Sequence, residues 1–129
     1  MQTFEKTLTV TVDDLDELEH VNNVQYVHWV MDIAKSHWLN NATPALLKNY
    51  FWVLVSHHID YKSSAVLNDT ILLKSYVTQA EGVSSTRLVE MYHKQSNRLL
   101  VTSETKWCLM DAKTKRPTRI TEELANLFN

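Results

Sequence analysis

The sequence has little of the residue types that most often punctuate or cross-link a chain: one glycine, one cysteine and two prolines in 129 residues. With Gly82 as the only glycine, the glycine-rich phosphate loops of Walker and Rossmann proteins are excluded. The single cysteine, Cys108, cannot form an internal disulfide. Pro44 and Pro117 stand alone, and no low-complexity tract or linker divides the chain. We therefore expect one domain over residues 1–129.

An excess of positive charge and a long apolar run are absent as well. Thirteen Lys and Arg residues stand against 15 Asp and Glu residues, so the net charge of −2 gives no reason to expect a nucleic-acid partner. No stretch approaches the roughly 20 apolar residues that span a bilayer, and the N-terminus lacks a signal-peptide pattern. We expect a cytoplasmic protein with no membrane segment.

Hydrophobic periodicity predicts one long helix and several strands. Alternating apolar and polar residues predict five strands, at residues 3–12, 51–61, 70–78, 84–94 and 99–110, with Ala80, Glu81 and Gly82 as the hairpin turn between the third and the fourth. Apolar residues at three- and four-residue spacing from Val24 to Trp38 predict the helix, and because most of its circumference is apolar we expect it to be buried on several sides. A short helical turn is expected at 45–50, and a last helix at 121–128, where a threonine precedes two glutamates.

The order of these elements predicts an α+β fold, with a curved antiparallel sheet of about five strands wrapped around one long central helix. Such a sheet leaves long edges that oligomerisation would cover.

The residues best suited to chemistry lie together directly before the long helix. Asp14, Asp16 and His20 are followed at once by Asn22 and Asn23. No second histidine or cysteine stands near enough to complete a coordination shell, so we predict no metal site. One of the two asparagines is expected to cap the first turn of the helix. The cluster predicts acid/base and hydrogen-bonding chemistry.

The same stretch, D-L-D-E-L-E-H-V-N-N-V-Q-Y, resembles the signature D-x-D-x-x-G-H-V-N-N-x-x-Y of hotdog-fold acyl thioesterases, the hydroxybenzoyl-CoA thioesterase and acyl-ACP thioesterase group. The C-terminal segment from Asp111 to Leu124, D-A-K-T-K-R-P-T-R-I-T-E-E-L, resembles the tail of that group. The resemblance covers essentially the whole chain. The first motif matches at Asp14, Asp16, His20, Val21, Asn22, Asn23 and Tyr26.

This resemblance implies a hotdog fold that assembles as a dimer or a dimer of dimers, with active sites between protomers. It implies hydrolysis of a fatty or aromatic acyl thioester of coenzyme A or acyl carrier protein, without metal or organic cofactor. Asp16 matches the catalytic carboxylate of the group, and His20 matches the histidine of the D-x-N-x-H triplet in the plant acyl-ACP branch. The sequence departs from the pattern at Leu18, where that triplet has Asn, and at Glu19, where the signature has Gly.

Thioester hydrolysis needs an activated nucleophile and stabilisation of the charge that develops on the carbonyl oxygen. Our hypothesis assigns Asp16 as general base or nucleophile, and the backbone N–H groups from Val21 to Asn23, at the positive end of the helix, as the oxyanion site. His20 and Asn23 would orient substrate or water.

Each of these residues also has a structural interpretation. Asn22 and Asn23 fit a capping role as well as a substrate contact, and His20 fits a partly buried, hydrogen-bonded histidine. Tyr26 and Trp29 fit either the core or the wall of an acyl pocket.

Titratable residues elsewhere carry weaker signals. His57 and His58 are adjacent in a strand, so their side chains should point to opposite faces and cannot both line one site. Four positively charged side chains have the right charge to bind coenzyme A phosphates, although scattered surface cations usually have no specific partner. Cys108 has no catalytic motif around it, and we interpret it as structural. The four cations are Arg87, Lys94, Lys106 and Arg116.

The sequence leaves two other functions open. The departures at Leu18 and Glu19 leave room for a non-catalytic acyl-thioester binding protein that keeps the acyl tunnel. A hotdog dehydratase would use His20 with Asp16 at an acyl β-carbon, although the H-V-N-N signature favours a thioesterase. The acyl chain length, the choice between coenzyme A and carrier protein, and the choice between dimer and tetramer are not determined by the sequence.

Overall fold

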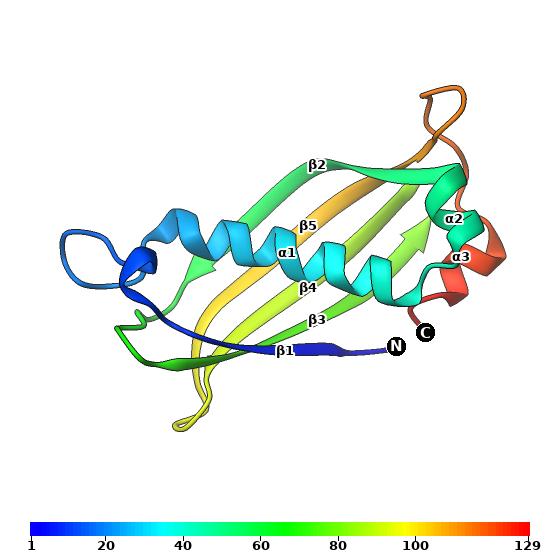
Figure 1. The fold of residues 1–129 in the computed structure, drawn as a ribbon. Helices are drawn as coiled ribbons and strands as arrows, with labels where there is room; N and C mark the ends of the chain where they lie inside the picture. The colour runs from blue at the N-terminus through cyan, green and yellow to red at the C-terminus, as the bar shows by residue number, and fades with distance from the viewer.

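The computed structural model describes all residues from 1 to 129 as a five-stranded antiparallel sheet that curves around one long helix (Figure 1). The helix, α1 (Asn23–Asn41), lies across one face of the sheet. The strands are ordered β1-β3-β4-β5-β2, and every neighbouring pair is antiparallel. They are β1 (Phe4–Thr9), β2 (Tyr50–Tyr61), β3 (Thr70–Glu81), β4 (Ser84–His93) and β5 (Arg98–Asp111).

Three short helical segments complete the chain. The 3-10 turn η1 (Val12–Asp14) follows β1, and α2 (Pro44–Asn49) connects α1 to β2. The last helix, α3 (Glu122–Asn126), lies beside α2 at the end of the sheet where α1 ends, and both chain termini are at this end (Figure 1). Leu46, Leu109 and Leu124 form a small second core that joins α2, β5 and α3.

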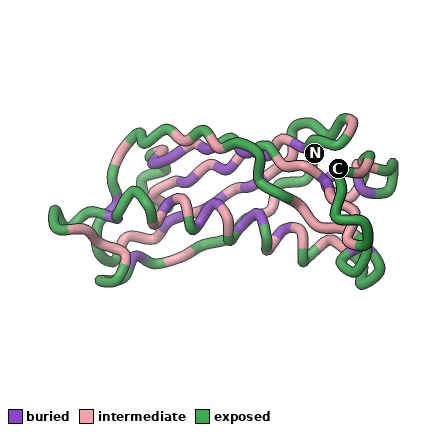
Figure 2. Tube along the Cα trace, turned by 90° about the horizontal axis from the view of Figure 1, so that it is seen from above, coloured by how far each residue is buried: buried purple, intermediate pink, exposed green.

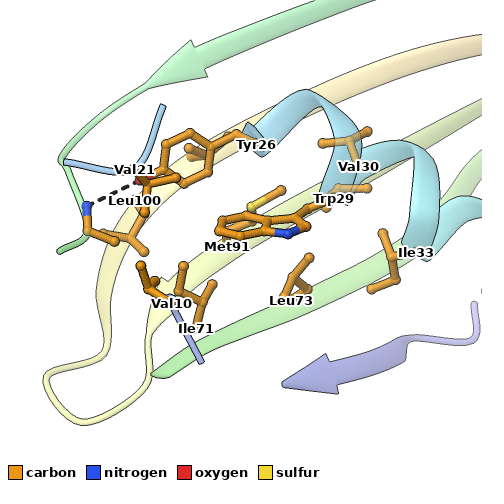
Figure 3. Packing of buried hydrophobic residues seen from close by; sticks show 13 residues of the cluster. Val10, Val21, Tyr26, Trp29, Val30, Ile33, Ile71, Leu73, Met91 and Leu100 are labelled. Atoms are coloured by element: carbon orange, nitrogen blue, oxygen red, sulfur yellow. Dashed lines mark hydrogen bonds between the residues drawn. The ribbon is translucent and has the colours of Figure 1, made fainter. Parts of the chain in front are cut away.

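The main core forms where one face of α1 meets the sheet (Figure 3). Buried positions recur along α1 and alternate with more exposed positions along the strands (Figure 2), as the periods of a helix and a strand require. The core side chains include Tyr26, Trp29, Val30 and Ile33 from α1 and Ile71, Leu73, Val89, Met91 and Val101 from the strands.

Local signals predicted several boundaries correctly. The only glycine, Gly82, has a φ of 63° in the tight turn between β3 and β4, a conformation that costs other residues energy. Thr121 caps α3 by accepting a hydrogen bond from Leu124 N at 3.2 Å. The predicted alternation in the last strand is confirmed, because Val101, Ser103 and Thr105 are all buried.

Two predictions about the first third of the chain were wrong. The first strand ends at Thr9, and Val12 lies in η1 with its side chain exposed. The helix α1 is not buried on several sides: it uses one broad face, and Val24 at its start is 60% exposed. In a single chain α1 is covered by the sheet and, near its end, by the C-terminal residues, so apolar residues on the opposite side remain open to solvent.

Candidate active site

The predicted polar cluster forms a tight loop that doubles back before α1. Leu15 pairs with Val21 in an antiparallel bridge, and Asp16 N donates to His20 O at 2.8 Å. The structure therefore brings Asp16 and His20 opposite each other. Asn23 lies three residues beyond His20, at the base of the loop where α1 begins.

The carboxylate of Asp16 is held by its own loop through one oxygen. Its Oδ1 accepts hydrogen bonds from Leu18 N at 2.9 Å and His20 N at 3.3 Å. No group in the protein bonds Oδ2, and the residue is only partly buried. One oxygen thus orients the side chain, while the other is free to accept a proton or to attack an electrophile.

The departure at Glu19 falls on a strained residue. Glu19 has a φ of 62°, in the left-handed region that glycine adopts most easily. The signature has glycine at this position because the loop reverses direction within a few residues, and this tight turn requires a positive φ. Glu19 is exposed and adopts the same left-handed backbone conformation, which has a higher energy for glutamate than for glycine.

The start of α1 offers fewer free amides than we predicted. Asn22 is the N-cap, and its side chain accepts a hydrogen bond from Val24 N at 2.9 Å. Val21 N already donates to Ala65 O at 3.0 Å, and Asn22 N donates to Asp14 O at 2.9 Å. The oxyanion prediction was therefore wrong for Val21 and Asn22, and the Asn23 N–H is the amide of this group that has no partner.

Three residues predicted near the site belong to the core. Val21 and Tyr26 are each 2% exposed, and Trp29 packs edge-to-face on Tyr26. The hydroxyl of Tyr26 accepts a hydrogen bond from Ala65 N at 3.2 Å (Figure 3). Because these side chains are enclosed by protein atoms, their first role is to fix α1 on the sheet. Of the aromatic rings that line a cavity, only Trp38 lies on α1.

A cavity of about 380 Å³ opens between the C-terminal half of α1 and the sheet. Its size is within the range of small-molecule sites. Seven of its ten lining residues are hydrophobic, and the aromatic members include Trp38, Trp52 and Trp107. These tryptophans come from α1, β2 and β5, so no single stretch of the sequence marks the wall of this cavity.

The polar floor of this cavity was missed by sequence reasoning. We had interpreted Arg87 as a surface cation, but it is 5% exposed and points inward from β4. Its Nη1 donates to His37 Nδ1 at 2.8 Å and to Ser75 Oγ at 2.7 Å. A signal existed, because strand alternation puts Arg87 on the same face as Val89 and Met91.

The two strand histidines behave as predicted, on opposite faces of β2. His57 faces inward and shares a 2.8 Å hydrogen bond with Ser103 Oγ, whereas His58 is exposed and pairs with Asp60 at 3.2 Å. Burial, with a smaller effect from His58, lowers the pKa of His57. No group of three or more His, Cys, Asp or Glu side chains is arranged to hold a metal ion, and no helix is long and apolar enough to cross a bilayer.

Comparisons with known proteins identify the family and the fold. The family model of the thioesterase-like superfamily matches residues 10–128, and the chain belongs to this superfamily. No curated protein matches the sequence. The fold is the hotdog fold, as the resemblance implied.

Three solved structures illustrate the likeness. YbaW, a probable thioesterase from Escherichia coli, has a TM-score of 0.86 at 22% identity, over 95% of this chain and 94% of its own. Slr0204, a 1,4-dihydroxy-2-naphthoyl-CoA thioesterase from Synechocystis, has a TM-score of 0.84 at 18% identity, over 98% and 95%. SAV2348 from Staphylococcus aureus, solved in complex with CoA, has a TM-score of 0.86 at 18% identity, over 98% and 81%.

Proposed function

We propose that this protein is an acyl thioesterase that hydrolyses an acyl thioester of coenzyme A, or of acyl carrier protein, to a free acid and a thiol. The observation that carries the proposal is the Asp16 carboxylate, held through Oδ1 with Oδ2 free, on an open loop before α1 in a chain of the thioesterase-like superfamily. Coenzyme A is the favoured carrier, since SAV2348 has CoA bound.

In the general-base route, Asp16 Oδ2 takes a proton from a water molecule whose oxygen attacks the thioester carbonyl. The tetrahedral intermediate then breaks its C–S bond, and the leaving thiolate takes the proton back from Asp16. In the nucleophilic route, Oδ2 itself attacks and releases the thiol, and water hydrolyses the resulting anhydride. Both routes consume one water and yield one acid and one thiol.

We assign the oxyanion contact to the Asn23 N–H. This amide has no partner in the protein and lies at the start of a 19-residue helix, where the backbone dipoles favour negative charge. The exposed His20 ring makes no hydrogen bond and is free to orient substrate or water. Tyr61, at the end of β2, supports this region because its hydroxyl donates to Asn23 O at 3.1 Å.

We also propose that two copies pair along β2. This strand is one edge of the sheet, is 12 residues long, and exposes Val53, Leu54 and Val55. Long apolar edges are normally covered, whereas the opposite edge, β1, has only six residues. A two-fold axis near the middle of β2 would set Tyr61 of one copy beside Phe51 of the other. Phe51 lines the cavity, so the Asp16 loop of one protomer would face the cavity of its partner.

The test is free-thiol release from a panel of acyl-CoA thioesters that includes short, long and aromatic acyl groups. Wild type should release thiol, and Asp16→Asn should lower kcat by about 100-fold or more, as expected for loss of a general base or nucleophile. The matched control is Asp13→Asn, which removes an exposed carboxylate three residues away that makes no hydrogen bond.

Full activity in Asp16→Asn, or an equal loss in Asp13→Asn, would contradict the assignment of Asp16. Saturable acyl-CoA binding, with no thiol release from any member of the panel or from the corresponding acyl carrier protein thioesters, would instead identify a binding protein. Circular dichroism of each variant checks that the fold is retained.

A further inference from the structure

The cavity holds a buried positive charge that no carboxylate of the same chain neutralises. The guanidinium of Arg87 is bonded by His37 and Ser75, and the Phe128 ring covers it at 5.1 Å. No carboxylate oxygen lies within 4.0 Å of any Lys or Arg nitrogen; the only side-chain contacts of this kind join histidines to aspartates, His58 to Asp60 and His93 to Asp69. A buried charge without a counter-charge is costly, so its presence needs a reason.

Both polar partners of Arg87 are neutral. Arginine can only donate, so His37 Nδ1 must be the unprotonated acceptor, and its other nitrogen, Nε2, donates to Gln2 Oε1 at 2.8 Å. Burial and the nearby Arg87 lower the pKa of His37 to about 4. Burial lowers the pKa of Arg87 to about 10, so the guanidinium is still charged at neutral pH.

The free donors of Arg87 reach the cavity. Nη1 makes both protein hydrogen bonds, and Nε and Nη2 make none. Every fully shielded side-chain nitrogen or oxygen in the protein has a partner, so these two nitrogens are not shielded, and Arg87 lines the cavity. Lys35 from α1 adds a second cation to the wall, and no Asp or Glu lines it.

We propose that this cavity binds the far end of an acyl group that carries a carboxylate, so that ω-carboxyacyl thioesters are the preferred substrates. The planar guanidinium presents Nε and Nη2 to the two oxygens of a carboxylate, a geometry that Lys35 cannot offer. The apolar walls hold the methylene chain or ring between the carboxylate and the thioester. This inference rests on the proposed function, because it names the substrate class of that reaction.

The experiment compares matched CoA thioesters of α,ω-dicarboxylic and monocarboxylic acids with equal carbon numbers, from short to long. At the length that fits, wild type should prefer the ω-carboxy member by roughly 10- to 100-fold in kcat/KM, since hydrogen bonds to charged groups are of that strength. Arg87→Met should lose this preference while it still hydrolyses the neutral thioester, and Arg87→Lys should keep part of it. The control Lys106→Met removes an exposed cation from the opposite face of β5 and should keep the full preference.

A binding measurement separates this inference from the catalytic proposal. Three cavity tryptophans, Trp38, Trp52 and Trp107, report ligand entry by fluorescence. If no thioester is hydrolysed but the ω-carboxyacyl-CoA binds more tightly than its neutral match, and only while Arg87 is present, the cavity inference holds and the thioesterase proposal fails. Hydrolysis of neutral thioesters at least as fast as ω-carboxy ones at every length overturns the cavity inference alone.

A further readout covers the case in which Arg87→Met does not fold. Free carboxylic acids should then inhibit wild-type hydrolysis of a neutral acyl-CoA more strongly than the primary amides of the same acids, which have equal length and no charge. Equal inhibition by acid and amide at every length overturns the inference.

Discussion

Acid should destabilise this protein through one buried histidine, His37. Its ring is fully buried, stacked on Phe4 at 4.9 Å and packed edge-on against Phe128 at 4.6 Å. Gln2 accepts from one ring nitrogen, and Arg87 donates to the other. Protonation would place a second positive charge beside Arg87 and remove the acceptor for its Nη1, which is why burial and Arg87 together lower the pKa of His37 to about 4.

The sign and size of the effect follow from proton linkage. In the unfolded chain this histidine has a pKa near 6.5, so between pH 6.5 and about pH 4 the unfolded state binds more protons than the folded state. The contribution of neutral His37 to the free energy of unfolding is therefore complete above pH 6.5 and is lost as the pH falls toward 4. The loss amounts to about 2 kcal/mol at pH 5 and about 3 kcal/mol at pH 4.

Urea unfolding followed by tryptophan fluorescence, from pH 8 to pH 5, measures this loss. The matched variant is His37→Asn, whose Oδ1 can accept from Arg87 but does not titrate. Between pH 8 and pH 5, wild type should lose about 2 kcal/mol more than the variant, which lowers its urea midpoint by about 1 M more. The same pH dependence in both proteins would refute the neutral, buried state of His37.

Three further predictions test the loop, the core and the edge. Glu19→Gly should raise the free energy of unfolding by about 0.5–1 kcal/mol in urea titrations, because it relieves a left-handed backbone, and a lower stability would contradict that strain. Tyr26→Phe should lower the free energy of unfolding by about 1–3 kcal/mol, because Ala65 N–H is left without its acceptor in the core; a neutral result in thermal unfolding would argue against this bond. Val55→Lys should turn a dimer into a monomer in sedimentation velocity, with the exposed Val12→Lys as control, and a persistent dimer would place the interface away from β2.

The elements that the sequence predicts well are those set by near neighbours. Strand alternation, the spacing of apolar residues in α1, the turn at Gly82 and the cap at Thr121 depend on a few adjacent residues, and all of them appear in the structure. The motif before α1 likewise located the loop that sets Asp16 opposite His20.

The errors arise where a residue's surroundings come from distant parts of the chain. The Val21 amide was predicted to be free, but it donates a hydrogen bond to the carbonyl of Ala65, a residue more than 40 positions away in the chain. Arg87 was predicted to be on the surface because charged side chains usually are, although its alternation pattern pointed inward.

The sequence by itself determined the order of helix and strands, the family motif and the carboxylate proposed for catalysis, because each is encoded in contiguous residues. Only the tertiary structure decided which amides remain free, where the cavity opens, and that an arginine without a counter-ion lies on its wall. Those properties depend on how α1, β4 and the C-terminal residues pack against one another. Local sequence patterns do not predict such packing, because the segments are far apart in the chain.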